Sequence, residues 1–131
     1  MKISIVIPVF NEKDSINQLY NEIINSLNIR DYEIIFIDDG STDGSSEIVQ
    51  ELIQNNEKVN LIQFYRNYGK SAALSEGFKH SEGDYVVTMD ADLQDDPTEI
   101  ENLINKLEEG FDVVSGWKRN RKDPLSKRLP S

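Results

Sequence analysis

The sequence predicts an α/β fold in which a mainly parallel sheet is flanked by helices. Short apolar, often β-branched runs alternate along the chain with segments whose apolar residues recur at helical spacing, and the connections between them are short. This alternation is typical of βαβ units with right-handed crossovers. The 131 residues are enough for one domain with a buried core, and no internal repeat, low-complexity segment or linker divides them.

The predicted strands are short apolar runs. The first, "ISIVIPV" at 3–9, is apolar almost throughout, as expected of a strand that is buried on both faces. Its Pro8 cannot donate to a ladder, so we place it near the carboxyl end, where the chain leaves the sheet. Further strands are predicted at 32–38, 59–64, 84–90 and 111–116.

The helices between these strands are predicted from apolar residues three or four positions apart. In the first helix these residues are Ile16, Leu19, Tyr20, Ile23, Ile24 and Leu27. Two more helices are predicted at 45–54 and 71–79, and a further one is marked by Ile100, Leu103, Ile104 and Leu107. Each helix connects two strands, so the strands are expected to run in the same direction.

Charge and composition exclude several functional classes. The formal net charge of −10 argues against a protein that coats nucleic acid. The chain has no cysteine, which excludes disulfides and thiolate metal sites and fits a cytoplasmic protein. No apolar run is long enough to cross a bilayer and the chain begins with a predicted strand, so neither a transmembrane helix nor a signal peptide is expected.

The charge is unevenly distributed. Residues 1–117 carry 8 Lys or Arg and 23 Asp or Glu, whereas residues 118–131 carry 6 and 1. The basic tail at 118–131 is therefore a separate electrostatic region that favours an anionic partner. A solvated terminal charge run is the alternative for this segment.

Acidic side chains follow three of the predicted strands. The three connections read Phe10-Asn11-Glu12, Asp38-Asp39-Gly40-Ser41 and Asp90-Ala91-Asp92. In open parallel sheets, ligands bind outside the carboxyl ends of the strands, so these connections are expected to share one site. Neither the glycine-rich dinucleotide fingerprint nor a P-loop is present. A divalent cation held by carboxylates is then the available means of binding phosphates. For the Asp38–Ser41 connection, an ordinary turn is the alternative.

The aspartates of "DADLQDDP" (90–97) divide into two groups. Asp90 and Asp92 lie two positions apart, so their side chains point to the same side and can converge on one Mg²⁺ or Mn²⁺, with Gln94 as a further oxygen ligand. The "DDPTE" segment at 95–99 is instead a helix-start pattern. Taken alone, the D-x-D pair fits a solvated loop as well as a metal site. The acidic residues at the other strand ends favour the metal site.

Five ordered blocks of the sequence resemble family 2 glycosyltransferases. They read "SIVIPVFNE" (4–12), "EIIFIDDGSTDGS" (33–45), "RNYGKSAALSEGF" (66–78), "GDYVVTMDADLQDDP" (83–97) and "DVVSGWKRNRKDP" (112–124). The last two blocks look most like the polyprenyl-phosphate branch, which contains dolichol-phosphate mannose synthases and bacterial undecaprenyl-phosphate sugar transferases. The resemblance runs along the whole chain.

The resemblance implies a GT-A fold, a nucleotide-sugar donor (UDP- or GDP-sugar), Mg²⁺ or Mn²⁺, inversion at the anomeric carbon and a polyprenyl-phosphate acceptor. It also implies that 1–131 is a single nucleotide-sugar-binding domain, incomplete at its C-terminus, because relatives continue into an acceptor-binding segment and often into membrane helices. We therefore expect the donor-binding part of a longer transferase that associates with the cytoplasmic face of the membrane. This part alone is expected to bind nucleotide with little or no transfer.

Residue roles follow from the matching positions of the blocks. Those implied to bind the nucleotide and sugar are Pro8, Val9, Phe10, Glu12, Asp38, Asp39, Lys70, Asp90 and Ala91. Those implied to hold the metal are Asp90, Asp92 and Gln94. Those implied to contact phosphates are Lys118, Arg119 and Arg121, although the family commonly has Gly-x-Arg where this chain has Gly116-Trp117-Lys118. For Lys70, which follows Arg66 and Asn67, a solvated loop is the alternative.

This chemistry needs no histidine base. Cleavage of a glycosyl–diphosphate bond places negative charge on the departing nucleotide, which a bound metal stabilises. An acceptor phosphate is largely ionised at neutral pH and is already a nucleophile. His80, the one histidine, is expected at the surface. The basic tail would counter the charge of the acceptor phosphate or contact anionic lipid.

Two other functions are compatible with an acidic edge of a parallel sheet. A sugar nucleotidyltransferase would have a glycine- and arginine-rich loop after the first strand, and "PVFNEKDS" (8–15) is not such a loop. A non-catalytic nucleotide-binding module would use the same edge. Transfer or hydrolysis of a donor sugar would distinguish an enzyme from a module.

Overall fold

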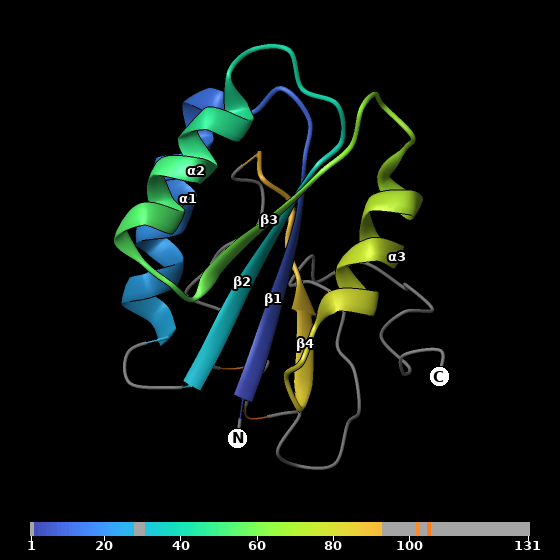
Figure 1. Ribbon diagram of the computed structural model, residues 1–131. Coiled ribbons are helices and arrows are strands. Elements are labelled where there is room, and N and C mark those ends of the chain that lie inside the picture. Colours follow the sequence, from blue (N-terminus) through green and yellow to red (C-terminus); the bar gives the residue numbers. More distant parts are fainter. Residues whose placement is uncertain (1, 28–30, 93–101, 103–104, 106–131) are drawn as a thin grey trace.

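The computed structural model describes residues 2–27, 31–92, 102 and 105. Within this part, four parallel strands form one sheet in the order β3-β2-β1-β4, with helices on both faces (Figure 1). The elements are β1 (Lys2–Val9), α1 (Lys13–Leu27), β2 (Asp31–Asp38), α2 (Ser45–Asn55), β3 (Val59–Gln63), α3 (Lys70–His80) and β4 (Tyr85–Thr88). The predicted α/β class with a parallel sheet is confirmed.

The predicted elements within this part are all present, and the differences lie at their ends. α1 begins at Lys13, one turn before its first apolar residue, because polar residues occupy the exposed first turn. β4 ends at Thr88, two residues earlier than predicted, although the N–H of Met89 still donates to the carbonyl of Val6 (3.0 Å). The helix predicted around Ile100–Leu107 and the strand at 111–116 lie outside the described residues, apart from Asn102 and Asn105.

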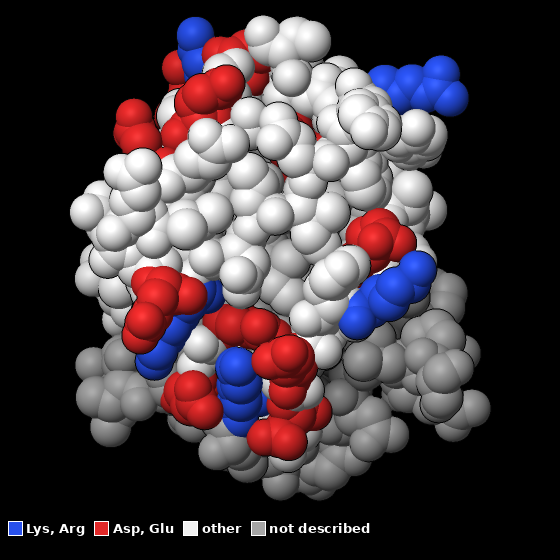
Figure 2. Space-filling view, in the orientation of Figure 1, with Lys and Arg blue, Asp and Glu red and all other residues white. Residues whose placement is uncertain are grey.

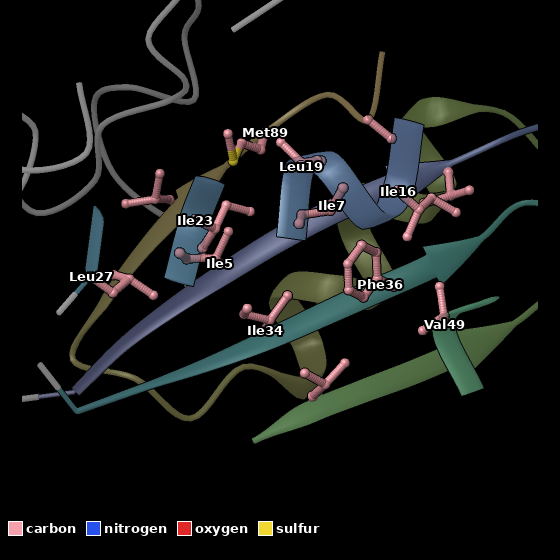
Figure 3. Close-up of a cluster of buried hydrophobic side chains, with 14 of the residues drawn as sticks. Ile5, Ile7, Ile16, Leu19, Ile23, Leu27, Ile34, Phe36, Val49 and Met89 are labelled. Atoms are coloured by element: carbon pink, nitrogen blue, oxygen red, sulfur yellow. The ribbon is translucent and has the colours of Figure 1, made fainter. Parts of the chain in front are cut away.

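The two faces of the sheet carry separate apolar cores. α1 and α2 cover one face and α3 covers the other (Figure 1). On the face under α1 and α2, alternate residues of β1 and β2 pack against the apolar residues of α1. These side chains are fully buried (Figure 3). The fully buried members shown there include Ile5, Ile7, Ile16, Leu19, Ile23, Leu27, Ile34 and Phe36. Burial of each such side chain contributes about 1.5–3 kcal/mol.

The core under α3 is smaller. It contains Val6, Ile35, Ile37, Ala73 and Val86. Because both faces of the central strands are buried, β1 and β2 read as nearly continuous apolar runs, which is why their prediction from sequence succeeded.

Asp43 joins the N-terminal ends of α1 and α2. Its carboxylate accepts hydrogen bonds from the N–H of Lys13 (3.2 Å) and from the N–H and hydroxyl of Ser45 (3.0 and 2.6 Å). A carboxylate at these positions satisfies amide donors that lack a partner within the helix and complements the helix dipoles. Both helices therefore begin at the edge of the sheet where β1 and β2 end. None of the helices in the described residues is long and apolar enough to span a membrane.

Candidate functional site

A cavity of about 510 Å³ lies at the carboxyl edge of the sheet. The ends of β1, β2 and β4 and the start of α3 contribute its walls, as expected for ligand sites in parallel sheets. The residues that line it are Pro8, Val9, Phe10, Glu12, Asp39, Asn67, Gly69, Lys70, Asp90, Ala91 and Asp92. Every residue implied to bind the donor lines this cavity, with the exception of Asp38, and both aspartates of the D-x-D pair line it as well.

The remaining predicted residues are placed differently. Gln94, Lys118, Arg119 and Arg121 lie outside the described residues. Asp38 is buried (1% exposed) and is not among the residues of the cavity wall. Its Oδ1 accepts the N–H of Ser41 (2.8 Å), whereas its Oδ2 is buried with no hydrogen-bond partner in the described part of the chain. Asp38 thus supports the turn after β2, and its contact with a donor stays a prediction.

Asp39 anchors the segment that leads into α3. Asp39 is buried (4% exposed), and its carboxylate accepts hydrogen bonds from the N–H of Tyr68 (2.7 Å), the N–H of Gly69 (3.0 Å) and the side-chain amide of Asn67 (3.1 Å). A carboxylate offers about four acceptor positions, so about one remains for a ligand. Asp39 therefore fixes the start of α3 and still faces the cavity.

Gly40 allows this segment to approach the end of β2. Its φ is +82°, and a Cβ on it would lie 2.3 Å from the backbone carbon of Arg66. Only glycine adopts this conformation without strain and leaves space for the neighbouring backbone. We call Asp39, Gly40 and the 66–69 segment the carboxyl-edge clamp.

An ion pair spans the cavity wall from α3 to the segment after β4. The Nζ of Lys70 lies 2.6 Å from Oδ1 of Asp90. The Lys70 side chain is half exposed (51%), and that of Asp90 is mostly buried (17%). The sequence predicted each residue as part of the donor site but not their contact.

Negative charge is concentrated around Glu12. Burial raises the pKa of its carboxyl, the hydrogen bond from Ser15 partly offsets this, and the charges of Asp92, Asp43 and Asp90 raise the pKa further. Figure 2 shows acidic side chains gathered at the top of the molecule, over the N-terminal ends of α1 and α2. Crowded carboxylates of this kind favour a cation.

Ser15 was not predicted from the sequence. Its Oγ is 2.7 Å from the carbonyl oxygen of Ala91, to which it donates, and lies 3.2 and 3.3 Å from oxygens of Glu12. This hydroxyl links the first turn of α1 to the residue between the two aspartates. Its position three residues after Glu12 is the available sequence signal, and that signal is weak because serine is common near helix starts.

The carboxylates present fit a magnesium or manganese ion shared with a substrate. Among the described residues, no group of three or more His, Cys, Asp or Glu side chains could hold a metal by itself. Asp90 and Asp92 nevertheless border one cavity, and the ammonium group of Lys70 already contacts Asp90 there as a cation. Mg²⁺ is commonly held by one or two carboxylates together with substrate phosphates. The oxygen donors suit Mn²⁺ equally.

The parallel sheet with helices on both faces and a cavity at its carboxyl edge has the GT-A fold of solved glycosyltransferases. The model of glycosyl transferase family 2 matches residues 4–130, and the chain belongs to this family. The predicted family and its GT-A fold are thereby confirmed.

Curated and solved relatives agree with this assignment. The chain is 42% identical over 134 residues to the undecaprenyl-phosphate 4-deoxy-4-formamido-L-arabinose transferase of Proteus mirabilis (strain HI4320), with 99% of this chain and 41% of the relative covered. The mannosyltransferase PcManGT of Pyrobaculum calidifontis, solved with GDP-Man and Mn²⁺, superposes with a TM-score of 0.70 at 26% identity over 81% of this chain and 31% of that one.

Residues 1–349 of TarS from S. aureus show the same fold, with a TM-score of 0.71 at 24% identity over 83% of this chain and 33% of that one. The chain thus spans about two fifths of the length of the curated relative described above.

Proposed function

We propose that this chain is the donor-binding part of an inverting, metal-dependent glycosyltransferase that transfers a sugar from a UDP- or GDP-sugar to a polyprenyl phosphate. The observation that carries this proposal is the single cavity in which the ends of three strands and the start of α3 gather nearly all the residues implied to bind a donor. The name of the Proteus mirabilis relative supports the acceptor class, and the PcManGT complex supports a nucleotide sugar with a divalent metal.

The nucleoside would occupy the wall formed by the end of β1. Pro8 and Phe10, which is 46% exposed, offer an apolar surface there, whereas Val9 lines the cavity but is buried (1% exposed). Such a surface suits a planar base. Asp39 would accept a hydrogen bond from the base or the ribose with the acceptor position that the carboxyl-edge clamp leaves open.

The diphosphate would lie between Lys70 and the D-x-D pair. Asp90 and Asp92, with Gln94, would hold Mg²⁺ or Mn²⁺, which stabilises charge on the departing nucleotide. Glu12 and the two aspartates would otherwise repel a diphosphate. Binding of the nucleotide is therefore expected to require the cation.

The basic tail at 118–131 would bind the acceptor. Lys118, Arg119 and Arg121 are proposed to contact phosphate, and the charge of 118–131 would attract an anionic acceptor or membrane surface. The phosphate oxygen of a polyprenyl phosphate attacks the anomeric carbon, the bond to the nucleoside diphosphate breaks, and the configuration inverts. The whole enzyme is expected at the cytoplasmic face of a membrane. Family membership gives no support to the alternative of a sugar nucleotidyltransferase.

Calorimetry tests the proposal. The chain is titrated with UDP and with GDP, in Mn²⁺ and in EDTA, together with Asp92→Ala. Asp14→Ala removes the same charge from the exposed first turn of α1, outside the cavity wall, and is the matched control. We expect the chain to bind one of the two nucleotides, and only in the presence of Mn²⁺. The Asp92→Ala variant should lose this binding, and the Asp14→Ala variant should keep it. Equal binding in EDTA, or binding of neither nucleotide by the folded chain, would overturn the proposal.

Transfer itself needs a separate assay. A membrane fraction with undecaprenyl phosphate and radiolabelled nucleotide sugars would distinguish an enzyme from a nucleotide-binding module. Because the chain spans 41% of the Proteus mirabilis relative, we expect binding without efficient transfer from this chain alone.

A further inference from the structure

Lys70 carries the single positive charge on the described cavity wall. The same wall contains the carboxylates of Glu12, Asp39, Asp90 and Asp92. The ammonium group forms an ion pair with Asp90, in which Nζ lies 2.6 Å from Oδ1. Because Asp90 is also the first aspartate of the D-x-D pair, the ammonium group contacts the carboxylate that a divalent cation would use.

The two partners differ in their freedom to move. Asp90 follows Met89, the residue after β4, whose N–H donates to the carbonyl of Val6 (3.0 Å), and the Asp90 side chain is 17% exposed. Lys70 is the first residue of α3. The N–H of the preceding residue, Gly69, donates a hydrogen bond to the carboxylate of Asp39, which holds the start of the helix in place. The Lys70 side chain is nevertheless 51% exposed, so its four-carbon stem can rotate while the helix stays in place.

We propose that Lys70 pairs with the carboxylate of Asp90 that a divalent cation would use, and that its ammonium group moves to the diphosphate when cation and nucleotide bind together. This inference rests on the proposed function. In the absence of nucleotide, a cation bound at Asp90 would displace the ammonium group of Lys70 from this carboxylate. The displaced ammonium group would then lie near the cation and repel it. With the nucleotide present, the displaced ammonium group gains the phosphate oxygens as partners.

Lys70 therefore couples the two ligands. The nucleotide strengthens cation binding because it accepts the displaced lysine, and the cation strengthens nucleotide binding by the same factor. Without the lysine charge, the cation alone no longer competes with Lys70 for Asp90, while the nucleotide loses a partner. The coupling between the ligands decreases, although each can still bind.

The test compares Lys70→Met with the unchanged chain. Electron paramagnetic resonance of free Mn²⁺ measures cation affinity with and without saturating UDP or GDP, and calorimetry measures the nucleotide in saturating Mn²⁺. We expect Lys70→Met to bind Mn²⁺ alone more tightly and the nucleotide more weakly. The enhancement of Mn²⁺ affinity by nucleotide should fall by about fivefold or more, the lower range of typical coupling.

Two variants separate the ion pair from general charge effects. Lys79→Met removes the same charge from the other end of α3, where Nζ lies 3.2 Å from Glu76 outside the cavity wall, and should leave both affinities unchanged. Lys70→Arg keeps the charge and should retain most of the coupling. Tighter Mn²⁺ binding in Lys79→Met to the same extent would overturn the inference.

The outcomes also distinguish the inference from the proposed function. If the unchanged chain binds nucleotide with Mn²⁺ but Lys70→Met leaves the Mn²⁺ affinity unchanged or lower, the inference fails and the proposed function stands. If the unchanged chain binds neither ligand, both fail.

Discussion

At each end of the parallel strands, the carboxyl edge and the amino edge of the sheet, a buried carboxylate holds a neighbouring segment by hydrogen bonds. Only one of these two carboxylates faces the candidate site. At the carboxyl edge, Asp39 holds the segment that enters α3. At the amino edge, Glu33 (6% exposed) accepts hydrogen bonds from the hydroxyl of Ser4 and from the N–H of Glu82, both at 2.6 Å. The second carboxylate thus holds the segment that leaves α3.

Each edge also contains a closely packed glycine. A Cβ on Gly83 would lie 2.5 Å from Oγ of Ser4, as a Cβ on Gly40 would lie 2.3 Å from the backbone of Arg66. We call Ser4, Glu33 and the 82–83 segment the amino-edge clamp. The two clamps have the same construction, so burial of a hydrogen-bonded carboxylate marks a structural role at either edge.

What differs is the surroundings of the two carboxylates. Glu33 also borders a cavity, of about 470 Å³, but no Lys or Arg is among the described residues that line it. The cavity beside Asp39 contains the D-x-D pair and Lys70, at an edge where the helices α1, α2 and α3 all begin. Ligand binding is therefore expected at the carboxyl edge, where the strands end, the helices begin and the ammonium group of Lys70 lies beside the D-x-D pair.

The largest effects are expected from removal of the two carboxylates. Asp39→Ala and Glu33→Ala each leave buried amide or hydroxyl donors without a partner, and each should lower the free energy of unfolding by about 3 kcal/mol. Urea denaturation measures this loss. Asp39→Asn and Glu33→Gln keep one acceptor oxygen and should stay folded. Of these two, only Asp39→Asn should weaken Mn²⁺-dependent nucleotide binding, and equal weakening by Glu33→Gln would break the comparison.

The next effect concerns the glycine of the carboxyl-edge clamp. Gly40→Ala introduces a left-handed alanine and a clash with the backbone of Arg66, and should destabilise the chain by about 2–3 kcal/mol. Gly83→Ala, whose clash involves Ser4, is the matched control at the other edge. Urea denaturation and nucleotide calorimetry are measured for both. Both should destabilise, and Gly40→Ala alone should also weaken nucleotide binding.

The sequence predicted the strands and the shared edge because both follow from local pattern and topology. Continuous apolar runs identified β1 and β2, and parallel pairing then required that the residues after them meet at one edge. This is why Glu12, Asp39 and Asp90 were correctly expected close together.

The contacts within the site were not predictable in the same way. Two of the three donors to Asp39 are backbone amides, which leave no signature in the sequence. The pairing of Lys70 with Asp90 depends on where α3 lies over the sheet, and twenty positions separate the two residues in the chain. Likewise, Glu33 lies within the strand predicted at 32–38, and its partners Ser4 and Glu82 come from distant segments of the chain.

A smaller effect is expected at the link between α1 and the D-x-D segment. Ser15→Ala removes the hydroxyl that donates to the carbonyl of Ala91 and should cost about 1 kcal/mol, with a few-fold loss of Mn²⁺ affinity in the presence of nucleotide. Ser26→Ala, whose hydroxyl donates to Glu22 four positions earlier in α1, should change neither quantity measurably. Identical results for the two serine variants would show that Ser15 does not position the D-x-D pair.

The smallest effects separate two carboxylates by the sign of their pH dependence. The pKa of Glu12 is raised above its ordinary 4.5, chiefly by burial, so the folded chain retains a proton that the unfolded chain has released. The stability that Glu12 contributes therefore falls as pH rises from 4.5 through the higher folded pKa. Glu12→Gln removes this loss and, in EDTA, should be more stable than the unchanged chain by less than about 1 kcal/mol near neutral pH.

Asp43 should show the opposite dependence. The hydroxyl of Ser45 is the main cause that lowers its pKa below the ordinary 3.8. Its contribution is therefore present above 3.8 and is lost as pH falls through the lower folded pKa. Urea midpoints across the acid range should show Asp43→Asn less stable than the unchanged chain at neutral pH, with the difference vanishing in strong acid. If Glu12→Gln is also less stable at neutral pH, the native carboxylate of Glu12 stabilises the chain without any cation. Repulsion among the carboxylates at this edge would then be too weak to favour cation binding.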